Sequence, residues 1–181
     1  RAVVQTAAGS ALGRMVARLA ARRGVGVLNV VRRAEQADEL RAAGAEHVLC
    51  SGDADFGVQL RRRCETLRAT LAFDAVAGEL TGRLLGAMPR GRGGCVVVYG
   101  ALSEGAVSVP PDELIFRAKR VEGFWLSDYL GGLSLPGLVR RAAGVQRALR
   151  GDLRVEVRAR VGLEEAVAAV RDYEKRMGGG K

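Results

Sequence analysis

The chain has 181 residues, enough for one domain with a sizeable hydrophobic core. Its hydrophobic content of 48% fits a globular protein, and no apolar run is long enough to span a membrane. The formal net charge of +9 would suit a nucleic acid, but nearly all 29 basic residues are arginines and no aromatic residues interleave with them, so we attribute the charge to a GC-rich coding sequence.

Apolar segments of strand length alternate with helical patterns from the N-terminus onward. We expect strands at residues 2–5, 27–31, 47–50, 71–75, 95–99 and 120–124. The helices expected between them cover residues 11–23, 34–43, 57–66, 79–88 and 112–117. Since βαβ crossovers are right-handed, this order predicts an α/β fold: a doubly wound parallel sheet of six strands with helices on both faces.

Beyond Ser127 we expect a loop, a long helix around 135–149, a strand at 155–161 and a helix from Leu163 to about Arg176. The chain begins inside a buried-looking strand without a methionine, and it ends in a glycine-rich, turn-like segment. We therefore expect it to be one domain of a longer polypeptide.

The three cysteines, Cys50, Cys64 and Cys95, are odd in number and too scattered for a zinc site or a disulfide framework. This usage fits a reducing, cytosolic-type compartment. Cys50 and Cys95 fall in apolar strands, where we expect small buried hydrophobes. The single histidine, His47, has no second ligand near it in sequence, so we expect neither catalysis nor metal binding from it.

The first strand runs through a loop of small residues straight into a helix. If Gly13 is the last glycine of a G-x-G-x-x-G pattern, Ala8 and Ser10 occupy the other two glycine positions. Gly13 allows close helix–strand contact, and Ser10 offers a hydroxyl to a phosphate oxygen. Because a helix N-terminus favours an anion, we expect Ser10, Ala11, Leu12 and Gly13 to bind a phosphate group; the alternative is a plain strand–helix turn.

Two arginines, Arg32 and Arg33, follow the second strand. A site for NAD would place an acidic residue there to bond the ribose, but the first acid is Glu35, inside the next helix. Guanidinium groups bind phosphate in bidentate fashion, so this position predicts the 2′-phosphate of NADPH. The alternative is a pair of solvated arginines in an arginine-rich chain.

Small or planar residues stand at the ends of the later strands. They are Tyr99, Gly100, Ala101 and Leu102 at the end of the fifth strand, and Phe124, Trp125 and Leu126 at the end of the sixth. Glycine lets a backbone approach a ligand, and the aromatic side chains could pack on a nicotinamide ring. Trp125 could equally anchor an interface.

Taken together, these segments resemble the medium-chain dehydrogenase/reductase superfamily, and within it the zinc-free quinone oxidoreductases and 2-enoyl thioester reductases. The likeness is carried by residues 6–13, 29–33, 43–48, 98–101 and 123–127. It implies a Rossmann fold, with residues 1–181 as the NADP-binding domain. It also implies an oxidoreductase that uses NADPH to reduce an activated carbon–carbon double bond, in an enoyl thioester or quinone-like substrate, by hydride transfer.

By the same resemblance, Ser10 to Gly13 would hold the pyrophosphate, Arg32 and Arg33 the 2′-phosphate, and the segments 99–102 and 124–126 the nicotinamide end. Lys181 would also reach the cofactor. The resemblance further implies a GroES-like domain and a final strand in the same polypeptide, both absent from this chain. We therefore expect no catalytic residue and no metal here, no turnover by the isolated chain, and a homodimer through the strand at 120–124.

Two other readings stay open. A zinc-dependent alcohol dehydrogenase of the same superfamily would carry most of its metal ligands in the absent domain. A non-catalytic nucleotide-binding module that contacts RNA or a partner protein is motivated by the charge alone. The expected location is the cytoplasm, or the mitochondrial matrix if the source is eukaryotic.

Overall fold

The computed structural model describes residues 1–91, 93–151, 153–154 and 159–178. Six parallel strands form one sheet in the order β3-β2-β1-β4-β5-β6. The strands are β1 (Ala2–Gln5), β2 (Gly26–Val31), β3 (His47–Cys50), β4 (Leu71–Asp74), β5 (Cys95–Val98) and β6 (Arg120–Gly123). The doubly wound sheet is confirmed, and the strand order reverses between β1 and β4.

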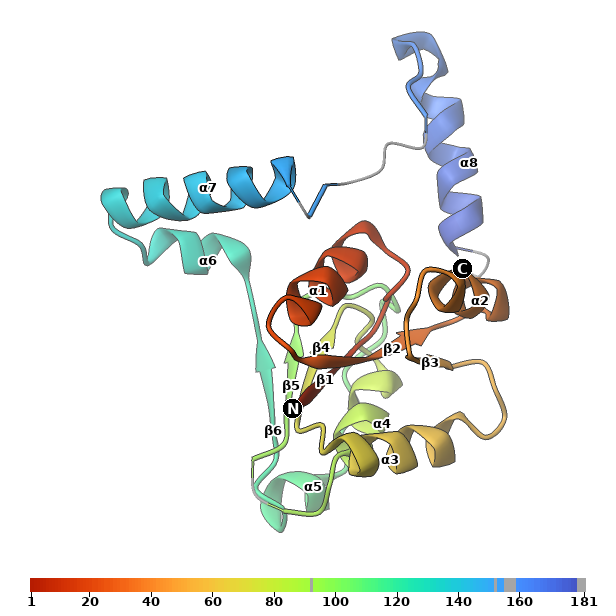
Figure 1. Cartoon of the computed structure of the whole chain (residues 1–181). Coiled ribbons are helices and arrows are strands. Elements are labelled where there is room, and N and C mark those ends of the chain that lie inside the picture. The colour runs from red at the N-terminus through yellow and green to blue at the C-terminus, as the bar shows by residue number, and fades with distance from the viewer. Residues whose placement is uncertain (92, 152, 155–158, 179–181) are drawn as a thin grey trace.

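Helices cover both faces of the sheet. They are α1 (Ala11–Ala21), α2 (Ala34–Ala42), α3 (Phe56–Leu67), α4 (Glu79–Ala87) and α5 (Pro111–Ile115). Right-handed crossovers put α1 and α2 on one face and α3, α4 and α5 on the other, as Figure 1 shows. The carboxyl ends of all six strands therefore meet at one edge of the sheet.

The larger core lies between the sheet and the helices α3 and α4. Phe56 and Leu60 of α3 and Leu84 and Leu85 of α4 are at most 1% exposed. Cys64 belongs to this core, and burial raises the pKa of its thiol to about 12. All three cysteines are free and buried, which confirms the interpretation of the two strand cysteines as small core residues.

The opposite face has a smaller core. Ala37 and Leu40 of α2 pack there with Val31 and Val48 of the sheet. On α1, in contrast, Leu12 stays 49% exposed. This face is thus less completely covered than the face under α3 and α4.

The chain after β6 departs from the prediction. Residues Leu126–Gly131 form a helix, α6, where a loop was expected. Trp125 stands at its N-cap without a capping hydrogen bond, so the usual polar start signal is missing from the sequence. The long helix is confirmed as α7 (Leu135–Arg150).

The last expected elements have mixed outcomes. Residues 155–158 of the expected strand at 155–161 lie outside the described residues, and residues 159–161 form no strand. The final helix is confirmed as a short turn, η1 (Leu163–Glu165), followed by α8 (Ala166–Gly178).

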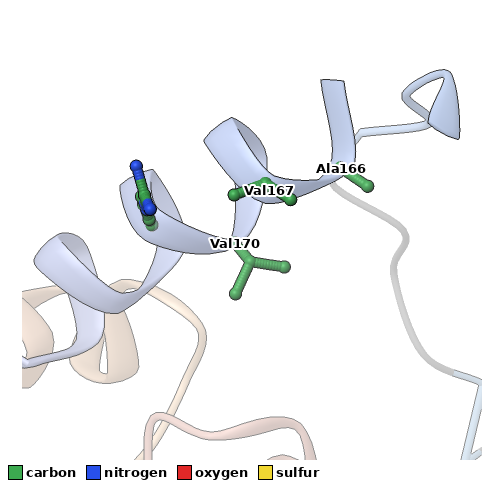
Figure 2. A pocket seen from close by; sticks show the side chains of 4 residues that line it. Ala166, Val167 and Val170 are labelled. Carbon is green, nitrogen blue, oxygen red and sulfur yellow. The ribbon is translucent and has the colours of Figure 1, made fainter. Parts of the chain in front are cut away.

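Helices α6, α7 and α8 project away from the sheet (Figure 1). Their apolar side chains are largely exposed, including Leu135, Val139 and Val145 on α7. Figure 2 shows Val167 and Val170 on α8, whose side chains are 63% and 56% exposed. Apolar faces of this kind mark surfaces that pack against another protein surface. None of the described helices is long and apolar enough to cross a membrane.

Candidate functional site

The turn between β1 and α1 presents an open helix N-terminus. Ser10 is the N-cap residue, and its Oγ accepts a hydrogen bond from Gly13 N at 3.0 Å. The amides of Ala11 and Leu12 precede the first intrahelical bond and point out of the helix end. The first turn contains no acidic residue, so the positive end of the helix dipole is not neutralised.

Gly13 brings this helix into backbone contact with the loop before it. A Cβ at this position would lie 2.6 Å from Ala8 O and 2.8 Å from Ala7 O, closer than real Cβ atoms approach. The Gly13 carbonyl also accepts a hydrogen bond from buried Gln5 Nε2 at 3.0 Å, and Gln5 in turn donates to Asn29 Oδ1 at 2.7 Å. The start of α1 is therefore fixed against both β1 and β2.

The two arginines follow β2, the neighbour of β1 in the sheet. Gln36 Oε1 accepts hydrogen bonds from the backbone amides of Arg32 and Arg33, each at 3.3 Å, which fixes the backbone there. The Arg32 side chain is exposed, whereas Arg33 Nη2 is buried without a hydrogen-bond partner among the described residues. Burying a guanidinium nitrogen without an acceptor costs free energy of folding, so this nitrogen is suited to donate a hydrogen bond to an anionic ligand. Glu35 is exposed on α2.

On the other side of β1 lies an apolar cavity of about 260 Å³. It is lined by Leu12, Val16, Phe73, Val97, Tyr99 and Phe124. The structure thus brings together one residue from each of three predicted groups: Leu12, Tyr99 and Phe124. Burial raises the pKa of the Tyr99 phenol, and the nearby charge of Asp74 raises it further.

The remaining predicted residues at this end lie outside the cavity lining. Gly100 packs its backbone against the loop after β4, since a Cβ there would lie 2.8 Å from Ala75 O. The exposed members of the group are Ala101, Leu102, Trp125 and Leu126. Lys181 lies outside the described residues. Contact of each with a cofactor stays a prediction.

Sequence reasoning missed a buried carboxyl group at the centre of this edge. Asp74, the last residue of β4, is 0% exposed. Its Oδ1 accepts hydrogen bonds from Thr6 Oγ1 at 2.8 Å, Val76 N at 2.9 Å and Ala77 N at 3.3 Å. Its Oδ2 accepts one from Thr81 Oγ1 at 2.7 Å. The available signal was an acid ending an apolar strand just before a run of small residues.

His47 begins β3, so it lies at the amino ends of the strands, away from this edge. The described part of the chain contains no group of three or more His, Cys, Asp or Glu residues that could hold a metal ion.

Comparisons with known proteins show the family to which this chain belongs. Residues 11–143 match the family model of zinc-binding dehydrogenases. The mitochondrial enoyl-[acyl-carrier-protein] reductase of Homo sapiens is 31% identical over 131 residues, covering 70% of this chain and 35% of that protein. Its Xenopus tropicalis counterpart is 32% identical over 139 residues, covering 70% of this chain and 37% of that protein. The chain therefore spans about a third of these relatives.

Solved structures show the same fold. A Mesorhizobium loti protein, provisionally assigned as an NADPH:quinone reductase, superposes with a TM-score of 0.81 at 34% identity, over 95% of this chain and 49% of that one. The mitochondrial 2-enoyl thioester reductase heterodimer of Candida tropicalis superposes with a TM-score of 0.75 at 19% identity, over 94% of this chain and 52% of that one.

Proposed function

This chain belongs to the zinc-binding dehydrogenase family, as the cofactor-binding domain of a medium-chain dehydrogenase/reductase, and we propose that it binds NADPH for the reduction of an activated carbon–carbon double bond. The observation that carries the proposal is Arg33 Nη2, which is buried without a partner among the described residues, at the end of the strand next to β1 and its open helix N-terminus. A dinucleotide lies across the point where strand order reverses, so we assign its pyrophosphate to the N-terminus of α1 and its adenosine ribose to the end of β2.

In this proposal the chain binds and orients the cofactor, which supplies the hydride when bound. The amides of Ala11 and Leu12 at the start of α1 hold the pyrophosphate, and Ser10 and Gly13 shape the turn that presents them. Arg32 and Arg33 hold the 2′-phosphate by charge-assisted hydrogen bonds. The apolar wall that includes Tyr99 and Phe124 excludes water around the nicotinamide.

The names of the relatives support a proposal for the substrate class. Several curated relatives are named enoyl-[acyl-carrier-protein] reductases, and one structural neighbour was solved with NADP and crotonyl-CoA. We assign this chain an enoyl thioester or a quinone-like compound as substrate. Because the chain spans about a third of those relatives, we assign the rest of the substrate cleft to a GroES-like domain of the same polypeptide. The exposed apolar faces of α7 and α8 offer that domain a packing surface, and without it we expect cofactor binding but no turnover.

Edge strand β6 supports a homodimer in the same proposal. Within the described part of the chain, β6 pairs only with β5, so its outer backbone groups face away from the sheet. Antiparallel pairing with a second copy would satisfy those groups and cover an edge that otherwise invites aggregation. The named relatives are mitochondrial, which favours the matrix over the cytoplasm if the source is eukaryotic.

Arginine replacement tests the cofactor assignment. The wild-type chain should bind NADPH more tightly than NADH by about 1–3 kcal/mol, the range for charge-assisted hydrogen bonds to a phosphate. The double variant Arg32→Ala/Arg33→Ala should lose this preference while retaining NADH binding. Isothermal titration of both cofactors against both proteins measures the change.

The matched control is Arg61→Ala/Arg62→Ala. It removes the same charge from exposed positions of α3, on the other face of the sheet, and should keep the preference. Unchanged NADPH/NADH discrimination in the Arg32/Arg33 variant would contradict the assignment.

A further inference from the structure

Two loops at the carboxyl edge of the sheet are joined into one unit. These paired loops are residues 75–78 after β4 and residues 99–103 after β5. Two backbone hydrogen bonds link them. Leu102 N donates to the Ala75 carbonyl at 3.1 Å, and Ser103 N donates to the Val76 carbonyl at 2.9 Å. A displacement of one loop must therefore displace the other.

Asp74 holds the first of the paired loops in an unfavourable backbone conformation. Ala77 has a φ of 64°, in the left-handed region that a residue with a Cβ avoids, and Gly78 follows with a φ of 66°. The hydrogen bonds from the amides of Val76 and Ala77 to Asp74 Oδ1 offset the cost of this conformation. The carboxylate thus acts as a template for the loop.

The same residue reaches the turn after β1. Thr6 lies in that turn, and its hydroxyl donates to Asp74 Oδ1 at 2.8 Å while accepting from Ala75 N at 2.8 Å. The Asp74 carbonyl also accepts from Tyr99 N at 2.9 Å. Asp74 therefore connects the carboxyl ends of β1, β4 and β5.

We propose that Asp74 is a positioning residue for the nicotinamide half of the dinucleotide, an inference that rests on the proposed function. Asp74 is 0% exposed, so it acts through the paired loops and not by contact with the cofactor. The paired loops lie on the β4 side of β1, whereas Arg32 and Arg33 lie on the β2 side. Loss of the carboxylate should therefore disturb one half of the ligand and spare the other.

Two ligands separate these halves. Adenosine 2′,5′-bisphosphate carries the adenosine and the 2′-phosphate but no nicotinamide, whereas NADPH carries all three. In Asp74→Asn, which keeps the shape but loses the charge of the acceptor, we expect NADPH to bind about tenfold more weakly, since hydrogen bonds to a neutral acceptor are weaker. Binding of the bisphosphate should stay within about twofold of wild type, because its contacts do not depend on charge at Asp74.

The matched control is Thr81→Val. It removes the hydroxyl that donates to Asp74 Oδ2 at 2.7 Å and leaves the loop amides on Oδ1. NADPH affinity in this variant should stay close to wild type, because the amides of Val76 and Ala77 keep their acceptor and the lost hydrogen bond lies outside the paired loops. If Asp74→Asn does not fold, Thr6→Val perturbs the same acceptor. Because Thr6 lies in the turn that would hold the pyrophosphate, the readout is then hydrogen exchange: faster exchange than in wild type at the amides of Val76 and Ala77 supports the proposal, and unchanged exchange overturns it.

The proposal is overturned if Asp74→Asn binds NADPH as wild type does, or if both ligands weaken by the same factor. If the wild-type chain binds neither ligand, the proposed function fails, and hydrogen exchange decides the positioning role separately. Faster exchange at the amides of Val76 and Ala77 in Asp74→Asn, but not in Thr81→Val, supports that role. Equal exchange rates in the two variants overturn it.

Discussion

Replacing Gly13 with alanine should abolish measurable NADPH binding and lower the free energy of unfolding by about 3 kcal/mol, the upper part of the range for overpacking a tight contact. The reason is steric. The added Cβ would lie 2.6 Å from Ala8 O and 2.8 Å from Ala7 O, and backbone atoms cannot turn aside as a flexible side chain can. Relief requires α1 to move away from the loop, which displaces the amides that would hold the pyrophosphate. Chemical denaturation and NADPH titration measure the two effects.

Gly9→Ala is the control in the same loop. A Cβ at Gly9 would have no heavy atom within 4 Å, and this residue is not among those with positive φ. Its stability and NADPH affinity should therefore remain close to wild type. If Gly9→Ala and Gly13→Ala behave alike, backbone contact at Gly13 does not shape the site.

Replacing Lys119 with methionine should destabilise the chain by about 3 kcal/mol, as expected when one partner of a buried ion pair is removed. Lys119 Nζ is fully buried and donates to Leu85 O at 2.7 Å and Met88 O at 3.0 Å, the carbonyls at the end of α4. It also pairs with Glu113 Oε2 at 2.7 Å. Arg117 lies 3.5 Å from the other carboxylate oxygen of Glu113 and compensates part of its charge, which places the loss at the lower end of the known range.

Denaturant unfolding of the single variant and of Lys119→Met/Glu113→Leu separates two causes of this loss, the α4 carbonyls without a donor and the Glu113 carboxylate without Lys119. The double variant removes the uncompensated carboxylate and should recover part of the stability. A single variant that unfolds within about 1 kcal/mol of wild type would show that the α4 carbonyls and Glu113 find other partners.

The sheet could be predicted as far as β6 because its strands are apolar runs separated by helices with clear ends. Gly24 and Gly44, for example, adopt the positive φ that ends a helix. After β6 this signal weakens. The short helix α6 lacks a polar N-cap, and its apolar residues remain exposed, so neither capping nor burial marks it in the sequence.

The local features that we propose for the adenosine end of the site could also be predicted, because each depends on a few neighbouring residues. A small-residue turn, a capped helix and a basic strand end each occupy a few consecutive residues. The supports of the site could not be predicted, because they join residues far apart in the chain. Thr6 and Asp74 are 68 positions apart. The same is true of the core contact of Lys119, which reaches back 31 and 34 positions to Met88 and Leu85.

The central claim is that the carboxyl ends of β1 and β2 hold a dinucleotide carrying a 2′-phosphate. A crystal structure of the chain with NADP⁺ tests it most directly. We predict the 2′-phosphate within hydrogen-bonding distance of Arg33 Nη2 and beside Arg32, with the pyrophosphate on the amides of Ala11 and Leu12. A bound cofactor whose 2′-phosphate lies away from both guanidinium groups would contradict the account.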